Sequence, residues 1–231
     1  MLEKNWHKDA ALLYVIVNEE MASKVITQAK RHGIRGATVM LGRGTIKNKW
    51  LNLIGVVDSR KEIVIMGTDT KTAREVMAHL GAHFHFEKPN RGIAFATAMQ
   101  GMVGTEAGKN WPEATARPPA DWQLVTTIVE RGLAEEVLAA AGQAGSRGGT
   151  VIPGRGSGVN QTQQVLGMEI EPEKDIVLML VPAKIAPAVE EAIDQRLDLE
   201  KPNHGILFTQ DIIAVTGLYQ PSQPTTPGSA S

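Results

Sequence analysis

The sequence contains no cysteine, and this absence excludes a disulfide framework, a thiolate nucleophile and a zinc–thiolate site. No apolar run reaches the roughly 20 residues that a membrane-spanning helix needs. The first residues lack the apolar core of a signal peptide. The net charge of −1 disfavours a general binder of nucleic acid or anionic membranes. We therefore expect a cytoplasmic protein with no nucleic-acid partner.

What the chain does contain is an internal repeat. Residues 87–93, Glu-Lys-Pro-Asn-Arg-Gly-Ile, return at 200–206 with only the fifth residue changed, to His. Residues 42–45, Gly-Arg-Gly-Thr, return at 154–157 as Gly-Arg-Gly-Ser. The offsets are 113 residues (87 to 200) and 112 residues (42 to 154), so the two copies differ in length by one inserted residue between these motifs. The repeat predicts a tandem duplication of a unit of roughly 100 residues.

The hydrophobic pattern predicts the same order of elements in both units. Apolar runs rich in β-branched residues indicate strands, and apolar residues at three- and four-residue spacing indicate helices. In the first unit we expect strands at 11–17, 37–41, 62–66 and 93–97, and helices at 22–29 and 73–80. Asn18 is the expected N-cap of the first helix, and Asp69 or Thr70 that of the second.

The second unit repeats this order. We expect strands at 124–129, 150–152, 176–181 and 206–208, and helices at 137–141 and 186–193. The β-α-β-β-α-β order predicts an α+β fold of two ferredoxin-like domains in tandem. The predicted boundaries are 9–105 for the first domain, 106–121 for a linker, 122–220 for the second domain and 221–231 for a disordered tail. Strand residues that are apolar on both faces also predict that each sheet packs against another sheet.

This order of elements, with a glycine-flanked loop after the second strand and a glycine-containing turn before the fourth, resembles the PII nitrogen-regulatory family. The resemblance covers nearly the whole chain, once per unit. It implies a homotrimeric signal-transduction protein that binds adenine nucleotides (ATP, ADP or AMP) in clefts between domains. It also implies control of a target protein, a membrane transporter or an enzyme, through mobile loops, here 45–54 and 157–166.

The repeated motifs also suit a ligand site on physical grounds. Glycines let the backbone approach a ligand, consecutive amides hold anions, and arginine or lysine adds a charge-assisted hydrogen bond to phosphate or carboxylate. Asparagine can hydrogen-bond a base or a sugar. The candidate ligand-binding residues are Gly42, Arg43, Gly44, Lys88, Asn90 and Gly92 in the first unit and Gly154, Arg155, Gly156, Lys201, Asn203 and Gly205 in the second.

Other interpretations of these residues stay open. Pro-Asn-x-Gly is also good turn chemistry, and Arg43 and Arg155 also suit an interface. Ile93 and Ile206 stand where the family has a lysine after the glycine of the turn. This departure favours an alternative function: a ligand-free adaptor module that binds a protein partner.

Catalysis and metal binding have weaker candidates. No Ser-His-Asp set, paired carboxylates or Walker-type lysine recurs in both units, so we expect no enzyme. His79 and His83 are one helical turn apart, a spacing that metals use, but their counterparts are Ala192 and Arg196. We therefore interpret these histidines as surface residues and expect no metal site.

Overall fold

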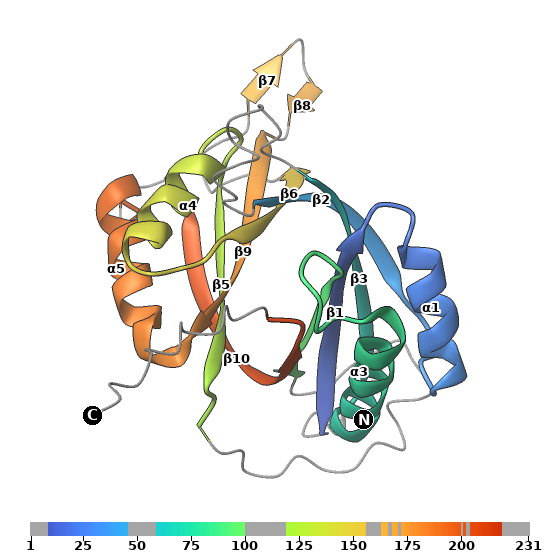
Figure 1. Ribbon diagram of the computed structural model, residues 1–231. Helices are drawn as coiled ribbons and strands as arrows, with labels where there is room; N and C mark the ends of the chain where they lie inside the picture. The colour runs from blue at the N-terminus through green and yellow to red at the C-terminus, as the bar shows by residue number, and fades with distance from the viewer. Residues whose placement is uncertain are drawn as a thin grey trace, which may run out of the picture.

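Eight antiparallel strands close into one barrel in the computed structural model, which describes residues 9–45, 59–99, 119–155, 163–165, 168–170, 172–199, 201 and 204–218 (Figure 1). The first half contains β1 (Ala10–Asn18), α1 (Ala22–Arg31), β2 (Thr38–Thr45), β3 (Ser59–Asp69), α3 (Thr70–Phe84) and β4 (Ile93–Met99). The second half contains β5 (Trp122–Glu130), α4 (Ala134–Gln143), β6 (Gly149–Arg155), β7 (Gln163–Val165), β8 (Met168–Ile170), β9 (Glu173–Pro182), the 3₁₀ helix η2 (Ala183–Ile185), α5 (Ala186–Leu197) and β10 (Ile206–Thr216).

The prediction of two tandem ferredoxin-like domains is wrong, although the order of helices and main strands is as expected. The strands follow one another around the barrel as β1-β3-β2-β6-β9-β5-β10-β4. The sheets of the two halves are therefore joined twice, at β2 with β6 and at β4 with β10. The physical reason is the second apolar face of the strands: the faces without helices bury one another inside a common barrel instead of each needing separate cover.

Three apolar clusters support this arrangement. Helices α1 and α3 cover the outer face of the first half, around Leu13, Val64 and Leu80. Helices α4 and α5 cover the second half, around Val125, Met179 and Ile193. The third cluster lies in the barrel interior and draws on both halves: Ile16, Ile63, Phe95, Leu124, Ile152, Leu178 and Ile212. Because its members come from both repeats, neither half buries this face alone.

The caps of two helices show how local chemistry fixes the elements. The side chain of Asp69 accepts a hydrogen bond from the Thr72 amide at 2.9 Å, so the predicted cap of α3 is confirmed. The predicted cap of α1 is wrong, because Asn18 still belongs to β1. The amide of Ala22 instead donates to the Glu62 carboxylate of β3 at 2.6 Å. Asn18 is thereby left for contacts at the end of the barrel.

The seam between β2 and β6 is short. Only Arg43, Gly44 and Thr45 pair with β6, opposite Val151, Thr150 and Gly149. The Thr45 hydroxyl donates to the Gly149 carbonyl at 3.0 Å and accepts from the Gly149 amide at 3.2 Å. A Cβ on Gly42 would lie 2.8 Å from the Val151 carbonyl, so glycine is what lets the two strands meet.

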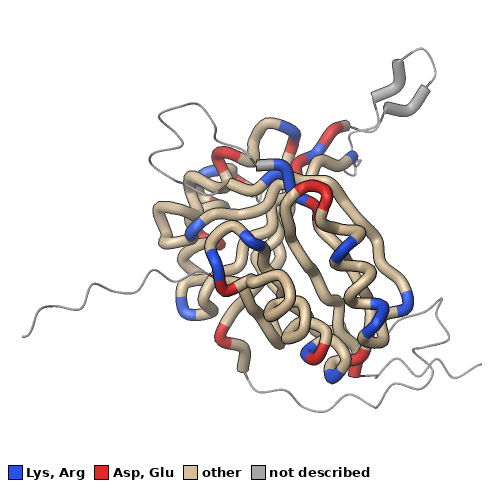
Figure 2. The backbone as a smooth tube through the Cα atoms, turned by 45° about the vertical axis from the view of Figure 1, so that its right-hand side comes forward, with Lys and Arg blue, Asp and Glu red and all other residues tan. Residues whose placement is uncertain are grey.

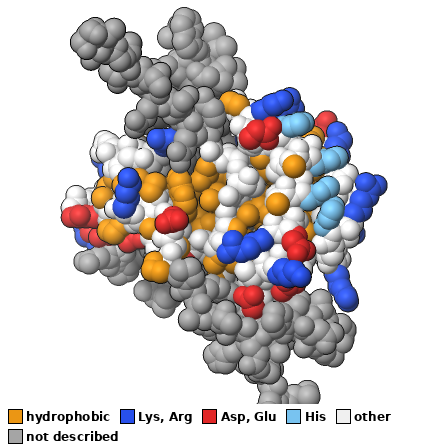
Figure 3. Space-filling view, turned by 60° about the horizontal axis from the view of Figure 1, so that its bottom comes forward, with side chains coloured by type: hydrophobic (Ala, Val, Ile, Leu, Met, Phe, Trp, Pro, Cys, Tyr) orange, Lys and Arg blue, Asp and Glu red, His pale blue; other side chains and the backbone are white. Residues whose placement is uncertain are grey.

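The surface mixes both signs of charge. Lys and Arg are interspersed with Asp and Glu over the described chain (Figure 2). Figure 3 shows a face whose centre is apolar and whose edge carries histidine side chains. Among the described residues, the large apolar side chains that stay exposed are Val39, Leu41, Ile206 and Phe208. Most of the predicted linker, the whole predicted tail and most of the two predicted loops lie outside the described residues, but strand β7 falls within the second predicted loop.

Candidate functional site

One end of the barrel interior holds a cavity of about 580 Å³, here called the mouth cavity. Its floor belongs to the interior cluster and is apolar, with Ile16, Phe95, Leu124 and Leu178 among its residues. Gly217 and Leu218, which follow β10, also line it. The cavity is thus an apolar space enclosed by strands of both halves.

The polar groups of the mouth cavity gather at its rim. Lys61 from β3, Asn90 from the turn before β4 and Arg147 from the loop before β6 contribute to its lining. The described residues that line it include no aspartate or glutamate. An apolar interior with two cations and no opposing carboxylate suits an organic anion with an apolar body.

Lys61 is held in place by a network of asparagines. Its ammonium donates to the Asn18 side-chain oxygen at 2.6 Å, and the Asn18 side-chain amide donates to the Asn90 carbonyl at 3.1 Å. An ammonium has three donors, and within the described chain the Asn18 side chain is the single hydrogen-bond partner of the Lys61 ammonium. Partial burial lowers the pKa of Lys61 from its ordinary value, because the charged form loses hydration. An anion at the rim would restore that lost stabilisation.

Arg147 is the second cation of the rim. It lies in the exposed loop before β6, beside Gly148 and Gly149, which also line the cavity. Within the described part of the chain, no hydrogen bond or ion pair engages its guanidinium. The planar guanidinium presents donors in a fork that matches a carboxylate or phosphate, so Arg147 is available for a two-pronged contact.

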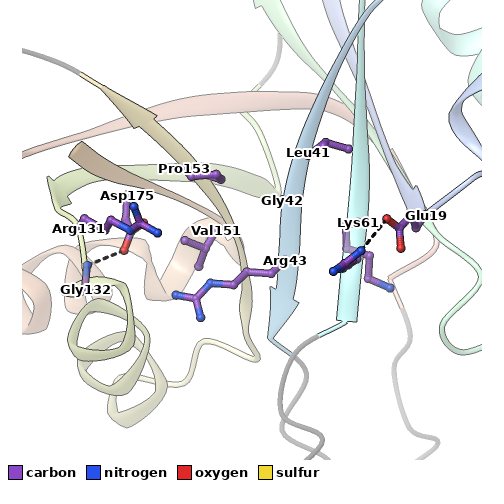
Figure 4. A pocket seen from close by; sticks show the side chains of 11 residues that line it. Glu19, Leu41, Gly42, Arg43, Lys61, Arg131, Gly132, Val151, Pro153 and Asp175 are labelled. Atoms are coloured by element: carbon purple, nitrogen blue, oxygen red, sulfur yellow. Dashed lines mark hydrogen bonds and ion pairs between the residues drawn. The ribbon is translucent and has the colours of Figure 1, made fainter. Parts of the chain in front are cut away.

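A second cavity, of about 590 Å³, lies along the β2–β6 seam and is here called the seam cleft (Figure 4). Its cations are Arg43, Arg60, Lys61 and Arg131, and its carboxylates are Glu19 and Asp175. Most of these charges already have partners. Arg43 lies 3.5 Å from Glu135, Arg60 lies 3.3 Å from Glu19, and Arg131 pairs with Glu173. The seam cleft is therefore a less favourable anion site than the mouth cavity.

The predicted site residues divide between these cavities. Gly42 and Arg43 line the seam cleft, whereas Gly44, Asn90 and Gly92 line the mouth cavity. The other described candidates line neither cavity: Lys88, Gly154, Arg155, Lys201 and Gly205. Gly156 and Asn203 lie outside the described residues. The structure thus brings Gly44, Asn90 and Gly92 of the first copy together at the mouth cavity, and none of the described candidates of the second copy lines either cavity.

The repeated turn has a structural role in both halves. Gly92 has φ +146° and Gly205 has φ +140°, a region that glycine alone adopts readily. A Cβ would lie 3.0 Å from the Ile16 carbonyl at Gly92 and 2.7 Å from the Ile128 carbonyl at Gly205. Lys201 pairs with Asp198. These contacts account for the repetition of the turn without any ligand.

Sequence reasoning missed the two rim cations and Asn18. Both cations recur in the repeat: Lys61 as Lys174, before the common Ile-Val, and Arg147 as Arg35, before a common glycine. A residue-by-residue comparison of the two copies would therefore have found them. That Lys61 and Arg147 line the same cavity could not be predicted from the sequence, because it depends on closure of the barrel.

The histidines that the structure describes lie outside both cavities. The rings of His32 and His79 lie 3.8 Å apart and those of His79 and His83 lie 5.7 Å apart, between their centroids. Some burial, and then the charges of His32 and His83, lower the pKa of His79 from its ordinary value. Among the described residues, no three His, Cys, Asp or Glu side chains are placed to hold a metal ion.

Comparisons with known proteins give distant likenesses. No protein-family model and no curated protein matches the chain. PII from Arabidopsis thaliana bound to citrate is 20% identical, with a TM-score of 0.31 over 42% of this chain and 79% of that one. The GlnK–ATP complex of B. subtilis is 16% identical, with a TM-score of 0.32 over 44% and 97%. An unknown protein from Galdieria sulphuraria is 11% identical, with a TM-score of 0.29 over 89% and 99%.

At these TM-scores and identities the likenesses establish neither a family nor a function, so membership of the PII family stays a prediction. Each PII-type match covers less than half of this chain. Within the described residues, no helix is long and apolar enough to cross a membrane.

Proposed function

We propose that this protein is a ligand-binding regulatory protein whose barrel mouth accepts a small organic anion. The apolar part of the ligand lies against Ile16, Phe95 and Leu124, and its anionic group lies between Lys61 and Arg147. The observation that carries the proposal is the apolar mouth cavity with two rim cations and no lining carboxylate among the described residues.

The size and chemistry of the cavity fit this class of ligand. Small-molecule pockets typically measure about 300–1,000 Å³ and are mostly apolar with a few placed polar groups. The mouth cavity, at about 580 Å³, lies within that range. A hydrogen bond to a charged group contributes about 1.5–3 kcal/mol. Lys61 is already oriented by Asn18, so little side-chain entropy remains to be lost on binding.

Adenine nucleotides (ATP, ADP or AMP) are the first ligands to test. A purine would occupy the apolar floor, its phosphates would meet the rim cations, and Asn90 would hydrogen-bond the base or the sugar. Aromatic carboxylates share the same chemistry, a flat apolar body with an anionic end. AMP and ADP differ from ATP in phosphate length, so their relative affinities report how far the rim reaches.

Regulation of a transporter or an enzyme follows if ligand binding changes a surface that a target contacts. Lys61 lines both the mouth cavity and the seam cleft, so an anion that engages it changes the charge that the seam presents. The predicted homotrimer stays a prediction and is checked by sedimentation equilibrium. Its premise of six separate domains does not hold, because each chain contributes one barrel.

A thermal-shift panel of ATP, ADP, AMP, cyclic nucleotides and carboxylates tests the proposal. Ligand at about 100 times its dissociation constant stabilises the folded state by about 2.7 kcal/mol. For a chain of this size that corresponds to roughly 5–10 °C in Tm. We expect one compound to shift the wild type by this amount and the double variant Lys61→Met/Arg147→Gln by little or nothing.

The repeat supplies the matched control. Lys174→Met/Arg35→Gln changes the same residue types at the equivalent positions, which do not line the mouth cavity. This control should keep the full shift. Equal shifts in both double variants, or no shift of the wild type by any compound, would contradict the proposal and favour the adaptor function.

A further inference from the structure

The β2–β6 seam leaves a strand edge open. β3 pairs with β2 from Thr38 to Gly44, but β6 pairs with β2 only from Arg43 onward. Continuing the register would bring Pro153 opposite Leu41, and proline has no amide hydrogen to donate to a ladder. Residues 38–42 of β2 therefore have no partner strand on that edge among the described strands.

This edge also carries exposed apolar side chains. Val39 is 41% exposed and Leu41 is 65% exposed. Proteins usually protect an open edge with lysine, proline or a cover, because unpaired backbone groups beside apolar side chains pair with any extended segment. Here the proline, Pro153, belongs to β6 and not to β2, so the edge of β2 itself keeps its backbone donors and acceptors.

The surroundings of the edge favour an acidic segment. The seam cleft reaches both strands, with Leu41 and Arg43 on one side and Val151 and Pro153 on the other (Figure 4). Its lining has four cationic side chains against two carboxylates. One of these carboxylates, that of the buried Asp175, accepts from the Gly132 amide at 2.9 Å. The net charge that faces the cleft is therefore positive.

The existing ion pairs do not prevent such binding. The side chains of Arg43 and Glu135 are 37% and 61% exposed, those of Arg60 and Glu19 are 82% and 49% exposed, and those of Arg131 and Glu173 are 61% and 51% exposed. Exposed pairs of this kind contribute little, about 0–1 kcal/mol. Carboxylates of an incoming segment can exchange with those of Glu135, Glu19 and Glu173, since these pairs are exposed to solvent.

We infer that residues 38–42 of β2 are the docking edge for an extended acidic segment of a partner protein, which adds as a strand and places carboxylates against Arg43 and Arg131. Backbone pairing to an open edge supplies affinity, and alternate side chains supply specificity. Val39, Leu41 and Arg43 lie on one face of β2, so in such a segment two apolar residues and then an acid follow one another at every second position, with the apolar residues packed on Val39 and Leu41. This inference is independent of any ligand in the mouth cavity.

Fluorescence anisotropy on the full-length protein tests the inference with a short labelled peptide, here called the Glu-Val peptide, in which serine alternates with Val, Val and Glu, so that the two valines and the glutamate share one face. We expect saturable binding to the wild type. Arg43→Gln and Arg131→Gln should each weaken it about tenfold, the loss of one charge-assisted contact. Arg74→Gln is the control, because Arg74 is exposed on α3 and lines neither the seam cleft nor the mouth cavity, and this variant should bind as the wild type does.

Two further peptides separate strand pairing from simple charge attraction. A Glu-Val peptide with alternate amides N-methylated keeps its charge but cannot complete a ladder, and it should lose binding. A Lys-Val peptide keeps the backbone and reverses the charge, and it should not bind. Binding of the methylated peptide with unchanged affinity, a response of Arg74→Gln equal to that of Arg43→Gln, or no binding of the Glu-Val peptide to the wild type would each overturn the inference.

Discussion

Gly42 and Gly154 occupy equivalent positions in the repeat, yet substituting each with alanine should have opposite effects. A Cβ at Gly42 would lie 2.8 Å from both the Val151 carbonyl and the end of the Ile63 side chain. A Cβ at Gly154 would lie 3.5 Å from the nearest atom of Ile176, an ordinary contact. Ile63 can turn away, but the Val151 carbonyl belongs to the backbone of β6. The Gly42→Ala methyl therefore pushes the two seam strands apart.

The magnitude follows from two terms. Alanine restricts the unfolded chain more than glycine does, which stabilises the folded state by about 0.4–1 kcal/mol at a compatible site. This term is common to both variants. Overpacking costs about 1–3 kcal/mol and applies to Gly42 alone. The difference between the two variants should therefore be about 1–3 kcal/mol, or roughly 2–12 °C in Tm for a chain of this size.

Urea unfolding followed by circular dichroism measures this difference directly. We expect the midpoint of Gly42→Ala to fall below that of the wild type and the midpoint of Gly154→Ala to equal or exceed it, with similar slopes. If the two repeats were separate domains, β6 would not lie against Gly42 and the two variants would behave alike. Equal midpoints would thus refute the closed barrel.

Three further predictions concern stability. Gly92→Ala and Gly205→Ala should both lower the urea midpoint, since each glycine combines positive φ with close strand contacts; a normal midpoint for either would contradict the strained turn. Asp69→Ala should cost about 0.5–2 kcal/mol through loss of the cap. Burial alone would raise the pKa of Asp69, but hydrogen bonds led by that from Thr72 outweigh it and lower the pKa. The contribution of Asp69 to stability should therefore be present above pH 3.8 and be lost as the pH falls through the lower pKa of the folded state. The depressed pKa of His79 should make the protein less stable as the pH falls below 6.5, because the unfolded chain binds the proton first. His79→Gln should flatten the dependence of the urea midpoint on pH, and an unchanged dependence would show that His79 does not cause it.

Local pattern was sufficient for the order of elements and for part of their chemistry. The run from Ala11 to Val17 and the helical spacing before Leu80 are properties of neighbouring residues, so β1 and α3 were predictable. Asp69 precedes an apolar helical run, which is why its cap was predictable too. Asn18 also precedes an apolar helical run, but the free amide of Ala22 at the start of α1 donates to the carboxylate of Glu62, which is distant in sequence.

Closure of the barrel was not predictable, because it depends on contacts between the two repeats. The sequence indicates that the strands need cover on both faces, and a neighbouring sheet of another domain would meet that need as well as a common barrel. Two seams close the barrel, β2 with β6 and β4 with β10, and both pair residues that are far apart in the sequence. The site was missed for the same reason: Lys61 and Arg147 belong to different repeats and meet only in the closed barrel.

Isothermal titration calorimetry tests the central claim most directly, with the compound that stabilises the wild type best in the thermal-shift panel. We predict one site per chain, and a dissociation constant that rises about tenfold or more in Lys61→Met, the loss expected for one charge-assisted hydrogen bond. Lys174→Met, at the equivalent position of the second repeat, should leave the constant unchanged. An unchanged constant in Lys61→Met, or an equal loss in Lys174→Met, would contradict the assignment of the ligand to the barrel mouth.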